Sequence, residues 1–427
     1  MGEPDAVVLQ AGARADRRRA GRVEQEDGLL AGATYFPPPD DEGGWRRATQ
    51  RGAVRRHAGI DTAALDDAFE YIQGSTQHGG LLMVRLGWLV YERYFGKGQR
   101  EATPNLASCG KSFTSIATGI LMAERPDLFS EGLDQEVFTP AHLPPEAFPL
   151  SDSRKAEIKL GHLLAFSAGI RGNNPCYVNG KETTIDPIGP DGWQSMVDEI
   201  ALGKRDDTYP DGRPYSTATL WCDPGGGYSY ASSSIHIASV MIRHITGREM
   251  EDYLAEKLAA PLGWGRWGFG YRHTEAGLHT PGGGGIALRA TDALRFLYLL
   301  LHRGRWEDRQ IVPADYVEHC SKRSPYNPHF PYSLQFSVNE GGAFPDLPQD
   351  ACWKAGSGGH ALYVVPSLDL VAYKLGGRDE QYSERNTRLP DPPPTGDEVG
   401  RKGWEKRVDD QTALRKTLKM IVASVVA

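Results

Sequence analysis

A serine and a lysine three residues apart, Ser108 and Lys111, have the types and the spacing that could perform chemistry. The apolar residues after them recur at intervals of three and four, which predicts one face of an amphipathic helix beginning near Ser108. These apolar positions are Phe113, Ile116, Ala117, Ile120 and Leu121. The free N–H groups and the dipole at a helix start stabilise negative charge on a nearby oxygen, and Ser108 is therefore expected to be a nucleophile. Lys111 lies about one turn later on the same side, where a desolvated amine can lose its proton and serve as a base.

The spacing Ser-x-x-Lys is a weak signal by itself, because a helix cap followed by a solvated lysine has the same pattern. Two rival motifs can be tested against the sequence. Gly110, Lys111 and Ser112 end like a phosphate-binding loop, but the first glycine of such a loop would fall at Asn105. Residues 355–359 come within one residue of a nucleophile elbow, whose histidine must follow later in the chain. The last histidine, His360, directly follows this segment, so no histidine is available later in the chain. Neither rival motif is therefore consistent with the sequence.

Two further segments follow the serine and the lysine. Residues 224–232 (PGGGYSYAS) precede a predicted helix, and residues 354–357 (KAGS) precede a pair of predicted strands. These segments and the Ser108 segment, in this order, resemble the serine β-lactamase and penicillin-binding-protein superfamily. The similarity is greatest to its class C-like branch, which includes class VIII carboxylesterases, D-stereospecific peptidases and 6-aminohexanoate-dimer hydrolases.

Weaker similarities support the resemblance. Residues 163–169 look like the Leu-Leu-x-x-x-Ser-Gly segment of that branch, with Ala168 inserted before the glycine, and residues 285–292 loosely resemble its later Gly-x-x-Ser-Thr-x-x-Asp segment. The resemblance covers about residues 60–376 and the final helix. It implies an α+β fold of the β-lactamase/transpeptidase type.

The resemblance also implies roles for individual residues. Ser108 would be the acylated nucleophile, Lys111 its partner, and Tyr230 a base or proton relay. The backbone N–H groups of Ser108 and Ser357 would form the oxyanion hole, which is usually the largest electrostatic contribution to such catalysis. Tyr228 competes with Tyr230 for its role, although the spacing from the proline and glycines favours Tyr230. Whether the lysine or the tyrosine is the formal base stays open.

The second and third motifs each depart from the pattern of the family at one residue. Lys354, Ala355 and Gly356 match a Lys-Thr-Gly motif whose lysine supports the electrostatics of the site and whose strand edge binds substrate. Ala355 replaces the threonine, and Ser232 stands where class C enzymes carry an asparagine. In the family both replaced side chains help to hold substrate amides. We therefore expect a small ester or an unusual amide as the substrate.

A carboxylesterase is the leading functional hypothesis, and no metal or organic cofactor is implied. The alternatives are a D-amino-acid amidase or peptidase, a linear-amide hydrolase of the 6-aminohexanoate type, a β-lactamase, and an acyltransferase if the acceptor is not water. A catalytically silent binding protein of the same fold stays open as well, although the serine, lysine and tyrosine are all present.

The predicted elements place strands near both ends of the chain. Residues 81–95 read as a hairpin around Leu86 and Gly87, and residues 360–365 and 369–375 read as two strands joined by a turn. These strands predict one antiparallel sheet assembled from both chain ends and flanked by helices, with a mostly helical region inserted between them. The helices predicted from periodicity begin near Asp61, Ser108, Ile158, Ser234, Thr291 and Leu414.

We therefore predict a domain over residues 59–427, with an α/β part at about 59–107 and 345–427 and a helical part at about 108–344. Residues 1–58 are rich in arginine, glycine, proline and aspartate and lack a sustained period, which predicts an extended or partly disordered arm. Residues 378–409 are charged and proline-rich and predict a long loop.

The composition excludes several classes of protein. The 427 residues include 48 basic and 55 acidic side chains, a net charge of −7 that does not favour nucleic-acid binding. No stretch reaches the roughly 18 apolar residues that suggest a membrane span. The five cysteines lack C-x-x-C spacing and predict neither a zinc site nor a disulfide framework. A charged run closely follows a short apolar stretch at the N-terminus, so the default expectation is a cytoplasmic protein, or an exported one if a signal was trimmed.

Overall fold

The computed structural model describes residues 34–185, 220–270, 279–383, 386–387 and 410–426. The chain divides into a short unit of residues 1–36 and a large unit of residues 37–427, which holds the helices and strands described below. Residues 1–33 of the arm predicted over residues 1–58, and most of the predicted loop over residues 378–409, lie outside the described residues. Among those described, no helix combines the length and the apolar character that crossing a bilayer requires.

A six-stranded antiparallel sheet is assembled from both ends of the large unit, as the sequence predicts. In spatial order its strands are β10 (Ser337–Val338), β11 (Cys352–Gly356), β12 (His360–Val365), β13 (Leu370–Leu375), β1 (Gly79–Arg85) and β2 (Trp88–Phe95). Leu86 and Gly87 join β1 to β2 with positive φ angles of 50° and 74°. Positive φ at both central residues gives a turn that matches the strand twist, so the predicted hairpin is confirmed.

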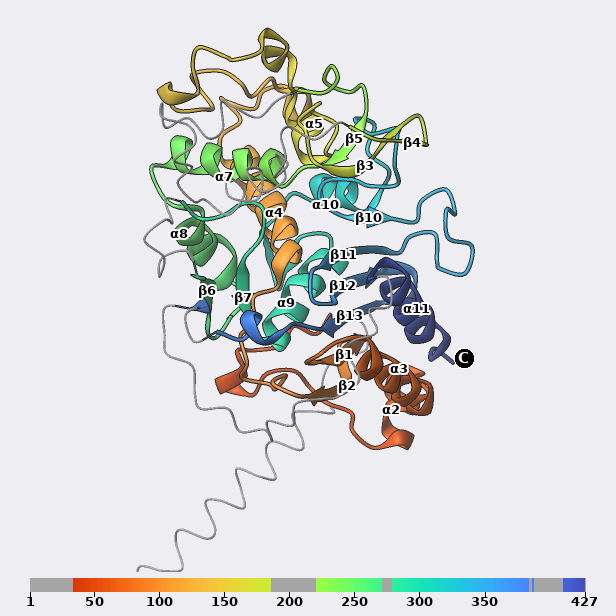
Figure 1. Ribbon diagram of the computed structural model, residues 1–427. Helices are drawn as coiled ribbons and strands as arrows, with labels where there is room; N and C mark the ends of the chain where they lie inside the picture. The colour runs from red at the N-terminus through yellow and green to blue at the C-terminus, as the bar shows by residue number, and fades with distance from the viewer. Residues whose placement is uncertain (1–33, 186–219, 271–278, 384–385, 388–409, 427) are drawn as a thin grey trace, which may run out of the picture. The chain divides into compact units, whose positions relative to one another are not determined.

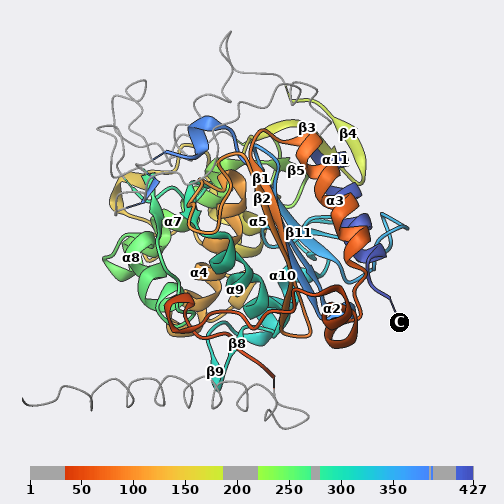
Figure 2. The same ribbon diagram turned by 90° about the horizontal axis from the view of Figure 1, so that it is seen from below.

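Three helices cover one face of the sheet: α2 (Arg51–Ala58), α3 (Thr62–Ser75) and the C-terminal α11 (Asp410–Ala423). Figure 2 shows α3 and α11 side by side on this face, away from α4 and α9. Asp61 caps α3 by accepting a hydrogen bond from Ala63 N at 3.0 Å. Buried Leu414, Leu418 and Ile421 of α11 join the core of this layer.

The opposite face is covered by α9 (Ala290–Leu301), beyond which the helical region is built (Figure 1). The helices of this region are α4 (Gly110–Glu124), α5 (Leu160–Leu164), α7 (Ser232–Thr246), α8 (Met250–Leu254) and α10 (Ala314–Ser321). Its small strands are β3 (Asn173–Val178), β4 (Lys181–Thr183), β5 (Tyr228–Tyr230), β6 (Trp267–Phe269), β7 (Ile286–Leu288), β8 (Arg305–Trp306) and β9 (Arg309–Gln310). Short helical turns lie at η1 (Asp40–Glu42), η2 (Ala107–Cys109), η3 (Gly132–Asp134), η4 (Pro145–Ala147), η5 (Ser153–Glu157), η6 (Ala255–Ala259), η8 (Pro366–Leu368) and η9 (Asp379–Gln381).

The helix after Ser108 is buried on all sides rather than amphipathic, which corrects the sequence-based expectation. Every residue of α4 from Gly110 to Leu121 is buried. Its polar side chains donate to backbone carbonyls of the surrounding loops. Ser112 Oγ donates to Gln335 O and Thr114 Oγ1 donates to Gly282 O, each at 2.9 Å. Buried polar groups are tolerated when they are hydrogen-bonded in this way.

Residues 37–58 are folded rather than extended or disordered, which corrects a second expectation. Trp45 is buried and α2 packs on the sheet. The segment also lies along the edge of β2, where Leu89 N donates to Arg46 O at 2.9 Å and Ala48 N donates to Leu89 O at 3.1 Å. These contacts with residues distant in the sequence fix the segment. Local periodicity does not reveal such contacts.

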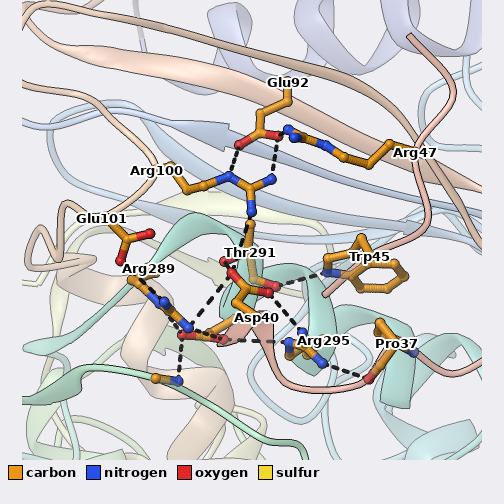
Figure 3. Close-up of polar contacts among 12 residues, drawn as sticks. Pro37, Asp40, Trp45, Arg47, Glu92, Arg100, Glu101, Arg289, Thr291 and Arg295 are labelled. Atoms are coloured by element: carbon orange, nitrogen blue, oxygen red, sulfur yellow. Dashed lines mark hydrogen bonds and ion pairs between the residues drawn. The ribbon is translucent and has the colours of Figure 1, made fainter. Parts of the chain in front are cut away.

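A cluster of charged side chains, here called the Asp40 cluster, attaches this segment to the rest of the unit (Figure 3). It comprises Asp40, Glu92, Arg100, Glu101, Arg289, Asp292 and Arg295. Asp40 accepts from Arg295 Nη2 at 2.9 Å and from Thr291 Oγ1 at 2.8 Å. Burial by itself would raise the pKa of Asp40, but the hydrogen bonds from Arg295 and Thr291 and the nearby arginine charges outweigh it and lower that pKa.

Candidate active site

Ser108 lies in the turn η2, directly before the buried helix α4. The preceding residue, Ala107, has a left-handed backbone with φ of 49°, a conformation that residues with a side chain rarely adopt. Ala107 N donates to Asn105 Oδ1 at 2.8 Å, which holds the turn in this shape. The serine therefore sits on a fixed turn at a helix start, as the sequence predicts.

Lys111 lies on the first turn of α4, and only 1% of its surface is exposed. Its Nζ donates to Ser108 Oγ at 3.0 Å and also to the carbonyl of Gly283. A nucleophile and a base must come this close for proton transfer, so the predicted pair has the required geometry. The carbonyl of Gly283 orients one N–H of the amine away from the serine.

Tyr230 ends the short strand β5, and its side chain hydrogen-bonds that of Ser108. Burial raises the pKa of Tyr230, and the hydrogen bond with Ser108 offsets this only in part, so the hydroxyl is protonated at neutral pH. Tyr228 is buried in an aromatic stack instead, with its ring 4.7 Å from that of Phe330. Of the two candidate tyrosines, the structure brings Tyr230 to the serine.

Lys354 lies in β11 behind the serine and is 2% exposed. Its amine donates to the Tyr332 hydroxyl, which in turn donates to Gln335 Oε1 at 3.0 Å. Burial and the charge of Lys111 hold the pKa of Lys354 well below the usual lysine range. The structure thus places a second amine close to the first one.

Two close backbone approaches hold the turn that carries Ser108. A Cβ at Gly356 would lie 2.3 Å from Leu106 O, and one at Gly284 would lie 2.8 Å from Ala107 O. Gly285 N also donates to Ala107 O at 3.3 Å. The glycines let the end of β11 and the loop before β7 contact the turn closely, which residues with side chains would prevent.

A cleft of about 370 Å³ opens beside the turn. Of the residues predicted for the site, Ser108, Lys111, Ser232 and Ser357 line it. Ser232 is the first residue of α7, and Ser357 follows the last residue of β11. Ala355 and Gly356 precede Ser357 on that strand, so the two segments predicted to supply the oxyanion N–H groups border one cleft.

The other lining residues include several that the sequence does not predict. They are Asn105, Ala107, Gly283, Gly284, Gly285, Gly358, Arg378, Glu380 and Gln381. A run of four glycines at 282–285 is a visible signal for a close backbone approach, but nothing in the sequence pairs it with Lys111. Arg378, Glu380 and Gln381 belong to a segment that we predicted as a long loop.

Two residues behind the cleft were also missed or left without a role. Tyr332, the partner of Lys354, stands in no recognisable motif. His236 is also buried, and its Nδ1 accepts from Gly282 N at 3.2 Å. Burial lowers the pKa of His236 to about 3, so the imidazole is neutral and can accept this bond. It therefore supports the glycine loop from behind.

A sequence model of the beta-lactamase family matches residues 65–389, and the chain belongs to that family. The family assignment agrees with the α+β fold and confirms the resemblance drawn from the three motifs. Among curated proteins, a comparison by sequence found no match.

Solved structures with the same fold share little sequence with this chain. A protein from Bacillus anthracis assigned as a 6-aminohexanoate-dimer hydrolase is 18% identical, with a TM-score of 0.58, covering 91% of this chain and 89% of that one. The hydrolase EstCE1, which has promiscuous acyltransferase activity, is 16% identical with a TM-score of 0.58, over 84% and 98% of the two chains. Unliganded simvastatin synthase (LovD) from Aspergillus terreus is 15% identical with a TM-score of 0.55, over 84% and 97%. At these identities the likeness shows the fold alone.

Proposed function

We propose that this protein is a serine hydrolase that forms an acyl-enzyme on Ser108 and acts on small esters as a carboxylesterase. The contact of Ser108 Oγ with Lys111 Nζ at 3.0 Å, completed by the hydrogen bond with Tyr230, carries this proposal. The contact lies at a helix start beside a cleft that can admit a small substrate.

In the proposed acylation, Ser108 Oγ attacks the ester carbonyl carbon while its proton passes to the amine of Lys111. The carbonyl oxygen becomes an oxyanion and accepts hydrogen bonds from the N–H groups of Ser108 and Ser357. The bond to the alcohol then breaks as a proton reaches the leaving oxygen through the Tyr230 hydroxyl. The raised pKa of Tyr230 favours this relay role over that of a standing phenolate base.

Deacylation repeats the sequence with water. A water molecule attacks the acyl carbon and gives its proton to the same lysine and tyrosine. The tetrahedral intermediate collapses, releasing the carboxylic acid and returning the proton to Ser108. An alcohol in the place of water would give transesterification by the same steps.

The preference for esters rests on two side chains. Ser232 and Ala355 are shorter than the asparagine and threonine that hold amides in the related lactamases, and Ser232 lines the cleft. An ester has a better leaving group than an amide and needs less help from such contacts. A site with reduced amide recognition can therefore still turn over an ester.

The test compares substrates on one preparation. Hydrolysis of p-nitrophenyl butyrate is expected to exceed that of nitrocefin, with Ser108→Ala as the blank for both. A fluorophosphonate should label Ser108 alone, as mapped by mass spectrometry of tryptic peptides. Nitrocefin turnover equal to or above ester turnover would replace the esterase proposal by a β-lactamase one. Labelling at Ser357, or at no serine, would reject Ser108 as the nucleophile.

A further inference from the structure

The proposed oxyanion hole joins two segments that are remote in the sequence. Ser108 lies on the turn before α4, whereas Ser357 follows β11 at the edge of the cleft. Donors of this kind are effective only when both are held in advance at the place where charge develops. Some contact must therefore fix the distance between the two segments at the cleft.

Gln381, the last residue of η9, contacts both of them. Its Nε2 donates to Asn105 O at 2.8 Å and to Ser357 O at 3.1 Å. Asn105 N in turn donates to Gln381 O at 2.8 Å. One amide nitrogen thus bridges a carbonyl three residues before Ser108 and the carbonyl of Ser357 itself.

The contact with Asn105 reaches the nucleophile through one more bond. Asn105 Oδ1 accepts from Ala107 N at 2.8 Å, and Ala107 is the left-handed residue directly before Ser108. Gln381 holds the backbone of Asn105 from one side while the Asn105 side chain fixes the turn on the other. The bridge therefore acts on the segment whose conformation sets the direction of the Ser108 N–H.

The surroundings of Gln381 are specific for a glutamine. Both N–H bonds of its amide are used in the bridge, and its Oε1 accepts from Arg378 N at 3.0 Å. A Cβ at Gly358 would lie 2.1 Å from this Oε1, so the close approach requires a glycine there. A glutamate would retain the shape but would set a carboxylate against two carbonyl oxygens.

We propose that Gln381 is a positioning residue that holds the two halves of the oxyanion hole in register. The proposal rests on the proposed function and names a residue that the family motifs do not include. Since its amide donors face backbone carbonyls, Gln381 acts through the N–H groups of Ser108 and Ser357. Its loss should weaken interactions made in the transition state more than the binding of substrate.

The experiment compares Gln381→Met and Gln381→Glu with the unmodified protein and with Gln310→Met. Gln310 is a matched control because its Nε2 also bridges two backbone carbonyls, those of Arg303 and Val312, and it does not line the cleft. The ligand is butylboronic acid, whose adduct with the serine presents a tetrahedral hydroxyl to the oxyanion hole. Hydrogen exchange of peptides that contain residues 105–108 and 356–358 is measured on the same samples.

In Gln381→Met, kcat/KM for p-nitrophenyl butyrate is expected to fall about tenfold or more, and the Ki of the boronate to rise by the same factor. Gln381→Glu should lower kcat/KM and the boronate affinity further. In both Gln381 variants, amide exchange should accelerate in the peptides that contain residues 105–108 and 356–358. Gln310→Met should change neither constant, although it loses a similar pair of hydrogen bonds. Equal loss in Gln310→Met and Gln381→Met, or unchanged boronate affinity in Gln381→Met, would overturn the positioning role.

The outcome also separates this proposal from the proposed function. If the unmodified protein neither hydrolyses the ester nor binds the boronate, the hydrolase proposal fails. The exchange data then decide the bridge by themselves: acceleration in both peptides supports it, and acceleration in one or neither overturns it.

Discussion

The candidate site holds two lysine amines against one tyrosine ring. The Nζ atoms of Lys111 and Lys354 each lie 5.1 Å from the centre of the Tyr230 ring. The pKa of Lys354 is lowered mainly by burial, and also by the charge of Lys111, because two ammonium ions beside one ring in a buried site repel each other. At least one amine is thereby favoured in the neutral form that proton transfer from a serine requires.

This arrangement predicts that Lys354→Met raises the thermal midpoint of the protein and lowers its esterase activity. The lowered pKa means that the unfolded chain binds the lysine proton more tightly than the folded one. The resulting penalty grows as pH falls from the ordinary lysine value of about 10.4 towards the lowered value, by about 1.4 kcal/mol for each pKa unit. The thermal midpoint of Lys354→Met should therefore exceed that of the unmodified protein by more at pH 7 than at pH 10.

Esterase activity of Lys354→Met is expected to fall on the order of 10²-fold, because a preorganised polar group of the site is lost. The control is Lys419→Met, which removes an exposed lysine paired with Asp346 and should change the midpoint little at either pH. Calorimetric scans at pH 7 and pH 10 measure the thermal midpoints of the three proteins. A difference between Lys354→Met and the unmodified protein that is the same at pH 7 and pH 10 would show that the Lys354 amine does not titrate abnormally.

Tyr230 and Tyr228 provide a matched pair within one short strand. Tyr230→Phe removes the hydroxyl that contacts Ser108 and should lower kcat by roughly 10²- to 10⁴-fold, the range of general acid–base contributions. Tyr228→Phe keeps the ring that stacks on Phe330 and should retain most activity. Circular dichroism confirms that both variants fold. An active Tyr230→Phe beside an inactive Tyr228→Phe would reverse the assignment.

At the scale of elements, the sequence predicted those helices and strands whose formation depends on local residue patterns. The hairpin of β1 and β2, the strands β12 and β13, and the helices α3, α7 and α11 were visible from periodicity and turn residues. The Ser108–Lys111 pair was equally visible, because one helical turn fixes its spacing. Tyr230 was reached only through a family resemblance, since β5 contains two tyrosines and periodicity does not choose between them.

What the sequence did not predict depends on contacts between distant segments. The apolar positions of α4 predicted an amphipathic helix, yet its polar side chains are buried and donate to the backbone of Gly282 and Gln335. Tyr332 and Gln381 reach the site from loops without regular spacing. The folding of residues 37–58 depends on Arg295 and on the edge of β2, which local composition does not reveal.

The close packing of elements around the Ser108 turn predicts that Gly356→Ala is damaging. The added Cβ would lie 2.3 Å from Leu106 O, so either β11 or the turn must shift. A displacement of about 1 Å in a catalytic group can reduce activity on the order of 10²-fold. The rate of fluorophosphonate labelling at Ser108 and kcat/KM for the ester measure this loss.

Gly74→Ala is the matched control for Gly356→Ala. Gly74 is the penultimate residue of α3, and a Cβ there would meet nothing within 4 Å. Alanine in this exposed position at the end of a helix should stabilise the protein by at most about 0.5 kcal/mol and leave labelling unchanged. Normal labelling of Gly356→Ala would show that β11 does not hold the turn.

At the scale of the whole unit, the Asp40 cluster connects the N-terminal segment to both approaches to the cleft. Arg100 and Glu101 belong to the loop that leads to Ser108, and Arg289 follows the strand after the glycine loop (Figure 3). Asp40 lies between these arginines and buried Arg295. The segment that lacks periodicity therefore stabilises the frame around the candidate site.

Asp40→Asn should destabilise the large unit by about 1.5–3 kcal/mol, because buried Arg295 loses the carboxylate that it contacts at 2.9 Å and keeps only Asp292, at 3.5 Å. The sign of the pH dependence follows from the lowered pKa of Asp40. A carboxylate whose folded pKa is depressed stabilises the protein above the unfolded value of about 3.9 and loses this contribution as pH falls through the folded value. The difference in free energy of unfolding between the two proteins should thus be full at pH 7 and shrink below about pH 4.

The control is Asp346→Asn, which breaks an exposed pair with Lys419 and should change the free energy of unfolding by about 0–1 kcal/mol. Urea unfolding of all three proteins at pH 7 and near pH 3 measures these differences, and an equal, small loss in both variants at pH 7 would show that the Asp40 cluster contributes no more than a surface ion pair.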